Sequence, residues 1–223
     1  MNKILKVFRY QVYESLTAVA IFYLVMLVVT LFLSTLGGSS SGLEFASAIF
    51  LFVVGLNSFK SSFRFLQFLG VTRKTFFAGT LLALVAIAAG MSVVDMVWGR
   101  LYAMIQPYTT LFSQTYTQGG ILTQVAWEMV LLSMFAFAGL FLTMLYYRSN
   151  KLMKIVISLS PVYVSVALNM FPSLLNPLSK VLGFLAGVRP NVGVWSNVSG
   201  MLVSIAAFAC LSFLLVRKAP IKR

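Results

Sequence analysis

The stretch NSFKSSFRFLQFLGVTRKTFFAGT, residues 57–80, lies between two long apolar runs and carries four basic residues and no acidic one. Its residues Phe59, Phe63 and Leu66 recur at helical spacing, so we predict a short amphipathic helix over about 59–70. An ordinary loop between two membrane spans needs no such pattern.

The sequence also predicts the turn that follows this helix. Gly70 follows the last periodic residues, where a helix can end in a left-handed conformation that favours a residue without a Cβ. Thr72 then stands where a new helix would take an N-cap oxygen. Two interpretations follow: a basic cytoplasmic loop whose helix lies on lipid headgroups, or a docking element for a soluble partner.

Within this stretch, FRFLQFLGVTRKTFFAGTLLA (63–83) resembles the loop after the second span in permease subunits of type 2 ATP-binding-cassette (ABC) exporters. In that family an aromatic-rich helix ends in a Gly-Val/Ile-Ser/Thr-Arg turn, and this coupling helix sits in a groove of the ATPase subunit. The rest of the chain resembles the family only in its pattern of spans. The resemblance therefore favours docking. It assigns the coupling to Phe63, Arg64, Phe65, Gln67, Leu69, Gly70, Val71, Arg73 and Lys74.

The composition is that of an integral membrane protein. Of the 223 residues, 60% are hydrophobic and 9% are charged, and the mean hydropathy is +0.96. A soluble domain is about 45–50% apolar and about 25% charged. The net charge of +13 does not indicate a nucleic-acid partner, because the basic residues flank apolar runs and form no separate basic face.

We predict an all-α polytopic membrane protein that forms one domain over residues 1–223. Residues 1–16 are basic and place their apolar side chains on one helical face, which indicates an interfacial helix on the cytoplasmic surface. The following apolar run is longer than the about 7–15 residues of a signal-peptide core, so we expect a retained first span. Six spans are predicted, at about 17–36, 43–58, 76–98, 122–147, 154–171 and 197–216.

Charge sets the predicted orientation. With the N-terminus inside, fourteen of the 17 Lys and Arg residues flank inner span ends, and only Arg100, Lys180 and Arg189 lie outside. This bias favours a cell-membrane protein with both termini in the cytoplasm. The two long outer segments, 99–121 and 171–196, are broken by Pro and Gly. We expect short helices there, either dipping into the outer leaflet or lying on its surface.

The residue inventory excludes most catalytic chemistry. The chain has no His and a single Cys, Cys210, which rules out imidazole metal sites, His-based triads and internal disulfides. No Gly-rich GK[ST] phosphate-binding loop is present. We therefore expect no catalytic residue, no metal site and no cofactor in this chain, and the resemblance places ATP and Mg in a partner ATPase.

The chain has only four acidic residues, which are Glu14, Glu44, Asp95 and Glu128. Asp95 and Glu128 fall near the outer ends of the third and fourth predicted spans. They either line an outer gate or pathway together with Arg100, or they are solvated at the interface. As a hypothesis, Asp95 pairs with Arg100 on the outer side.

Glu14 lies where the predicted interfacial helix meets the first span. Its default environment is the solvated interface. Alternatively, it pairs with Arg64 or Arg73 and fixes the N-terminal helix against the basic loop.

The resemblance implies the permease half of an ATP-driven exporter, embedded in membrane lipids. It would work as a dimer with a second copy or a paralogue, because two six-span halves together can enclose a polar path. Closure of a cytoplasmic ABC ATPase dimer would move the loop helix and lever spans two and three. Hydrophobic peptides, lipids and drugs stay open as substrates. The alternatives are a non-transporting membrane anchor or sensor subunit, and an ion-driven secondary transporter, which would need buried acids at mid-membrane.

Overall fold

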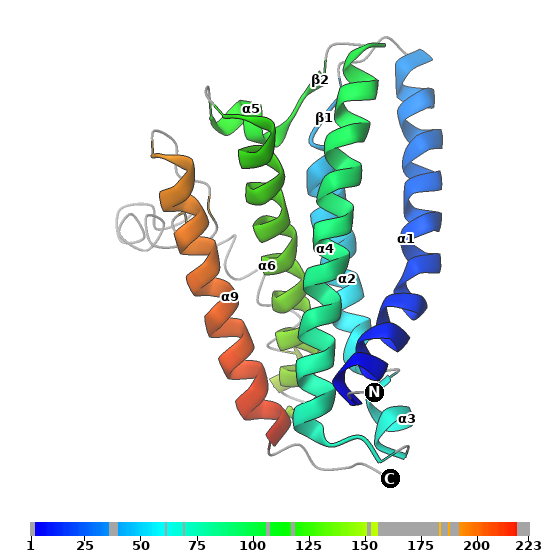
Figure 1. Cartoon of the computed structure of the whole chain (residues 1–223), viewed down its shortest axis with the longest axis vertical. Coiled ribbons are helices and arrows are strands. Elements are labelled where there is room, and N and C mark those ends of the chain that lie inside the picture. Colours follow the sequence, from blue (N-terminus) through cyan, green and yellow to red (C-terminus); the bar gives the residue numbers. More distant parts are fainter. Residues whose placement is uncertain are drawn as a thin grey trace.

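The structure is a computed structural model that describes residues 3–35, 40–60, 62–68, 70–105, 108–116, 119–150, 153–155, 183, 187 and 192–217. In this part of the chain, long helices run side by side and short elements lie at their ends (Figure 1). The helices are α1 (Lys3–Thr35), α2 (Leu43–Lys60), α3 (Ser62–Phe68), α4 (Arg73–Ala103), α5 (Leu111–Thr115), α6 (Ile121–Arg148) and α9 (Val194–Arg217). The strands are β1 (Ser40–Ser41) and β2 (Tyr108–Thr109).

Four of the described helices, α1, α4, α6 and α9, are long and apolar enough to cross a membrane, and α2 is a shorter apolar helix. In chain order, α1, α2, α4, α6 and α9 correspond to the first, second, third, fourth and sixth predicted spans. The fifth predicted span, at about 154–171, lies almost entirely outside the described residues. The all-helical membrane class is therefore confirmed, and the count of six spans stays a prediction.

The helix α1 joins two elements that the sequence analysis separated. The predicted interfacial helix over 1–16 and the first span over 17–36 form one helix, whose N-terminal part bends toward the rest of the bundle (Figure 1). The helix continues because no Gly or Pro occurs among its 33 residues to end it.

Glycines allow α2 and α6 to approach closely. A Cβ added to Gly55 of α2 would overlap the carbonyl oxygen of Ala136, and a Cβ added to Gly139 of α6 would overlap that of Phe52. Small residues at such crossings let two apolar helices bring their backbones together. The helix α6 also packs on α4 and α9, and α4 packs on α1, so α4 and α6 occupy the centre of the bundle.

The ends of the bundle differ. The start of α1, the helix α3 and the last turns of α6 and α9 gather at one end, which we name the α3 end (Figure 1). The opposite end, named the α5 end, carries α5 and the parallel strand pair, in which Ser40 is opposite Tyr108 and Ser41 is opposite Thr109. The span ends that carry the predicted inner charges therefore meet at the α3 end.

Candidate functional site

The turn between α3 and α4 has the geometry that its sequence predicts. Gly70 has a φ of +73°, in the left-handed region, and the Val71 N–H donates to the Leu66 carbonyl oxygen at 3.1 Å. The Thr72 side chain then caps α4 by accepting a hydrogen bond from the Thr75 N–H at 3.3 Å. The predicted glycine stop and threonine cap are both confirmed.

The helix α3 has one face buried against the bundle and one face exposed. Phe63 and Leu66 are buried and continue an apolar stripe that starts at Phe59, the penultimate residue of α2. On the other side Phe65 is exposed, and Phe68 leaves 91% of its surface uncovered. The predicted amphipathic helix is therefore present, although it divides between the end of α2 and α3.

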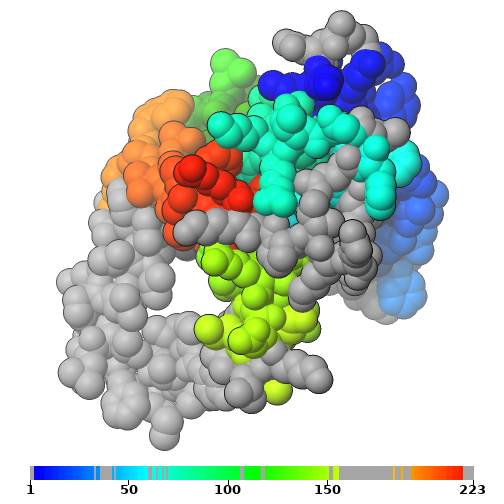
Figure 2. Space-filling view, turned by 90° about the horizontal axis from the view of Figure 1, so that it is seen from below, coloured from blue at the N-terminus to red at the C-terminus, as the bar shows by residue number. Residues whose placement is uncertain are grey.

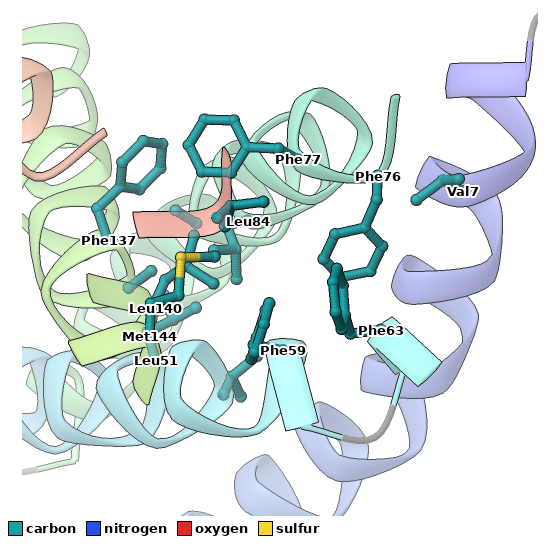
Figure 3. Packing of buried hydrophobic residues seen from close by; sticks show 14 of the residues in the cluster. Val7, Leu51, Phe59, Phe63, Phe76, Phe77, Leu84, Phe137, Leu140 and Met144 are labelled. Carbon is teal, nitrogen blue, oxygen red and sulfur yellow. The ribbon is translucent and has the colours of Figure 1, made fainter. Parts of the chain in front are cut away.

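Aromatic rings attach the buried face of α3 to its neighbours (Figure 3). The Phe63 ring lies 4.5 Å from the Phe59 ring and 5.2 Å from the Phe76 ring of α4, measured between centroids. Tyr147, near the end of α6, meets Phe59 edge-on at 5.5 Å. Aromatic pairs of this kind contribute about 0.5–1.5 kcal/mol each beyond their area burial. This group packs α3 on α2 and α4, and Phe59 of α2 in turn contacts α6.

The helix α3 is also joined directly to α1. The Ser62 hydroxyl donates a hydrogen bond of 2.8 Å to Glu14 Oε2, and the Tyr10 ring stacks on the Phe65 ring at 5.6 Å between centroids. The N-terminal part of α1 is thus held against the basic loop, as one interpretation of Glu14 expected. The observed partner of Glu14 is a serine of α3.

The remaining residues assigned to coupling are less completely described. Val71 is half-buried, Lys74 is exposed, and Arg73 Nη1 donates to the Arg217 carbonyl oxygen of α9 at 3.2 Å. The side chains of Arg64 and Gln67 and all of Leu69 lie outside the described part. The described members nevertheless share the α3 end of the bundle.

A second feature is a group of three acids inside the bundle, which we name the carboxyl cluster: Glu44 of α2, Asp95 of α4 and Glu128 of α6. All three are buried, and Asp95 and Glu128 expose 8% and 1% of their surface. The Tyr23 hydroxyl of α1 donates to Asp95 Oδ1 at 2.8 Å. The side chains of Ser47 and Glu128 lie within hydrogen-bonding reach of Asp95.

The burial of Asp95 and Glu128 speaks against one of the two interpretations, that they are solvated at the interface, and leaves the pathway lining as a prediction. The helix α4 extends to Ala103, so Asp95 lies eight residues, or about 12 Å at 1.5 Å per residue, inside its end. Arg100 is exposed, and no ion pair joins it to Asp95 among the described residues. The reason is geometric: residues five apart on a helix point in different directions, whereas pairs three or four apart are neighbours.

Glu44 was missed as a site residue. Its carboxylate accepts a hydrogen bond of 3.1 Å from the Tyr108 hydroxyl of β2. One sequence signal could have indicated it: the predicted topology places three of the four acids, Glu44, Asp95 and Glu128, toward the outer side of the membrane.

The chemistry of the cluster centres on protons. A hydrogen bond between the Asp95 and Glu128 carboxyl groups requires a proton on one of them, and two close carboxylates would repel strongly in a poorly solvated interior. Asp95 Oδ2 and Glu128 Oε1 have no hydrogen-bond partner among the described residues. Among the described residues, no three Cys, Asp or Glu side chains, those of the cluster included, are placed so that they could hold a metal ion together. A proton shared between the two carboxyl groups would relieve this repulsion.

No protein family model matches the chain, and neither the curated proteins nor the solved structures contain a match. The fold alone therefore indicates the class of protein. The long apolar helices are those of a transmembrane protein, with an amphipathic element at one end and buried carboxyl groups toward the other.

Proposed function

We propose that this chain is the membrane-spanning permease subunit of an ATP-driven ABC exporter. It would form the translocation pathway as a dimer and couple to a separate cytoplasmic ATPase dimer through the loop at 59–75. One observation carries the proposal: α3 packs a buried aromatic face on α2 and α4, and on its other side Phe68 is 91% exposed. A force applied to the exposed face of α3 would reach the helix bundle through the buried face of α3.

The contacts around α3 support this transmission. Phe63 touches Phe59 and Phe76, and these rings belong to the helices on either side of the loop. Displacement of α3 would therefore move the end of α2 and the start of α4 together. The Ser62–Glu14 hydrogen bond extends the connection to α1.

The surface around α3 suits a soluble partner. Figure 2 looks onto the α3 end, where α3 and the start of α4 (cyan) lie between the N-terminal part of α1 (blue) and the end of α9 (red). The exposed Phe65 and Phe68 supply apolar contact area, and the exposed Lys74 adds positive charge. Aromatic residues surrounded by polar or charged ones are typical of binding surfaces.

The test is co-purification from the native membrane. The tagged chain is cross-linked and purified, and any ATPase with a phosphate-binding loop is identified by mass spectrometry. Phe68→Ala should lower the recovered ATPase at least about tenfold, as expected for loss of a hot-spot aromatic residue worth about 1.4 kcal/mol or more. The unfolding midpoint should stay unchanged, since Phe68 packs little against its own chain.

Tyr13→Ala is the matched control, because Tyr13 is also an exposed aromatic residue, 67% uncovered, but lies on α1 outside the loop. It should leave ATPase recovery intact. Undiminished recovery with Phe68→Ala, or full transport by the protein without any nucleotide-hydrolysing partner, would contradict the proposal.

A specific observation favours a second function, an ion-driven secondary transporter. Such a transporter needs buried acids within the bundle, and Asp95 and Glu128 are both buried between helices. Ionisable groups inside a membrane bundle are costly and often mark proton or ion pathways. Substrate uptake into proteoliposomes driven by a proton gradient without nucleotide, and abolished by Asp95→Asn, would select this function instead.

A further inference from the structure

A cavity of about 480 Å³ lies between α6 and α9, where these helices reach the α3 end. At about 30 Å³ per water molecule it has room for about 16 waters, which is far more than a packing defect leaves. We name it the α6–α9 cavity. Its described wall consists of two arginines, Arg148 and Arg217, and of apolar side chains that are all leucines except Phe141.

Arginines from three helices meet at this end of the cavity. Arg148 is the last residue of α6 and Arg217 is the last residue of α9, and both are exposed. Arg73, at the start of α4, donates from Nη1 to the Arg217 carbonyl oxygen at 3.2 Å, which brings a third guanidinium to the end of α9. Because a helix C-terminus carries only about half a negative charge, the full charges of the arginines exceed it. This end of the cavity therefore attracts an anion.

The acidic side chains of the protein lie elsewhere. None of the four lines the α6–α9 cavity. Glu14 accepts a hydrogen bond from Ser62 of α3, and the other three acids are buried in the carboxyl cluster. A counter-charge for the arginines therefore comes from outside the described residues.

The apolar wall runs from the arginines toward the middle of the bundle. Phe141 lies seven residues before Arg148, or about 10 Å along α6, and Leu211 lies six residues before Arg217, or about 9 Å along α9. The Phe141 ring meets the Phe208 ring of α9 at 5.6 Å between centroids, and the other described lining residues lie between this contact and the helix ends. The cavity is therefore charged at its end and apolar along its length.

We propose that the α6–α9 cavity binds an anionic phospholipid of the leaflet that meets the α3 end. A planar guanidinium offers parallel N–H donors that match two phosphate oxygens, so Arg148 and Arg217 would hold the headgroup phosphate. An acyl chain would lie along the leucines, of which Leu211 and Leu214 are 46% and 58% exposed and so can be reached from the bilayer. Basic pockets between membrane helices are known to bind anionic headgroups. This inference does not rest on the proposed transport function.

The apolar wall separates a lipid site from basic residues that only flank a span. Arginines at span ends are common and need no ligand. A soluble anion would gain nothing from the leucines, whereas an acyl chain buries apolar surface against them. A bound headgroup would also lie beside Arg73 and would join the ends of α4, α6 and α9.

The test is native mass spectrometry of the full-length protein released from bilayers with equal amounts of phosphatidylglycerol and phosphatidylcholine that carry the same acyl chains. The wild-type protein should retain phosphatidylglycerol in preference, at one molecule per chain. Arg148→Gln and Arg217→Gln should each lower this retention at least about fivefold, as expected for one arginine beside an anionic headgroup. Equal retention of the two lipids by the wild-type protein would overturn the proposal.

The arginine variants should leave the fold intact, because both side chains are exposed and the Arg73 hydrogen bond goes to the backbone of Arg217. Arg9→Gln is the matched control for charge, since Arg9 is an exposed arginine of α1 at the same end and does not line the cavity. It should retain phosphatidylglycerol as the wild-type protein does. An equal loss with Arg9→Gln would mean that net charge attracts the lipid without the cavity, and would overturn the proposal.

A second pair of variants tests the apolar wall. Leu211→Trp adds bulk beside the acyl chain and leaves both arginines in place, so it should also lower retention at least about fivefold. Leu202→Trp adds the same bulk at a half-exposed position of α9 outside the cavity and should have no effect. Retention unchanged by Leu211→Trp would place the acyl chain elsewhere and overturn the proposal.

A soluble-anion arm distinguishes a lipid from a free phosphate. Glycerol 3-phosphate or inorganic phosphate is added in large excess to the detergent-purified protein and removed by buffer exchange before the mass measurement. Neither should displace phosphatidylglycerol, because neither carries an acyl chain. Displacement by either compound would identify a site for soluble phosphate and overturn the proposal.

Discussion

The Tyr23 hydroxyl of α1 donates a hydrogen bond of 2.8 Å to Asp95 of α4, and this bond connects residues 72 positions apart in the chain. It is the polar contact that attaches the first helix to the carboxyl cluster. Because Asp95 is buried, the loss of this donor cannot be fully replaced by water.

Tyr23→Phe should therefore lower the free energy of unfolding by about 1–3 kcal/mol, since it removes the donor and leaves the ring in place. The measurement is denaturant unfolding in detergent micelles, followed by circular dichroism. Tyr13→Phe removes a hydroxyl from a residue of the same helix that is 67% exposed, and it should change the free energy by less than about 0.5 kcal/mol. Equal effects of the two variants would show that the Tyr23–Asp95 bond contributes nothing specific.

Glu128→Gln should be tolerated to within about 1 kcal/mol, because an amide N–H can donate to Asp95 without an added proton. Glu128→Ala should cost about 2–5 kcal/mol, since it removes the contact and leaves a space among buried side chains. Both are measured by the same unfolding experiment. Infrared spectroscopy gives an independent readout: the wild-type protein should show a protonated-carboxyl band that Glu128→Gln loses. Its absence from the wild-type spectrum would rule out a shared proton.

Gly55→Ala and Gly139→Ala should each destabilise the protein by about 1–3 kcal/mol, because the added methyl group would meet a backbone carbonyl of the facing helix. Gly90→Ala is the control. No atom lies within 4 Å of the Cβ that it would add, and alanine is the better helix former, so its effect should be neutral or stabilising by up to about 1 kcal/mol. Unfolding midpoints that do not separate these variants would mean that α2 and α6 cross elsewhere.

Gly70→Val should destabilise the α3–α4 turn by about 1–2 kcal/mol, since a β-branched residue strongly disfavours a φ of +73°. Gly70→Asn should cost less, because asparagine visits the left-handed region more readily. There is open space around this position, so the difference reports backbone conformation and not steric overlap. Limited proteolysis at the turn and unfolding midpoints both measure it. A larger cost for Asn than for Val would exclude the left-handed turn.

The local features of this fold were predictable from short stretches of sequence. The stop at Gly70, the cap at Thr72 and the buried face at Phe63 follow from residues within one or two helical turns of each other. Backbone preferences and hydrophobic periodicity are local, and so sequence reasoning reaches them.

The carboxyl cluster was not predictable in the same way. The apolar run in the third span weakens at Trp98, but the helix continues to Ala103, and this difference hid the depth of Asp95. Which acids meet depends on the register of α2 against α4 and α6, which no single stretch specifies. The α6–α9 cavity likewise depends on how two helices distant in sequence pack, so no single stretch brings Arg148 and Arg217 together.

The continuity of α1 has a mechanical consequence. Glu14, which holds α3, and Tyr23, which holds Asp95, stand nine residues apart on the same unbroken helix, about 14 Å along its axis. No Gly or Pro interrupts the helix between these two attachments, so a tilt imposed at one is transmitted along α1 to the other. Protonation of the carboxyl cluster and a force applied to α3 would then both act on α1.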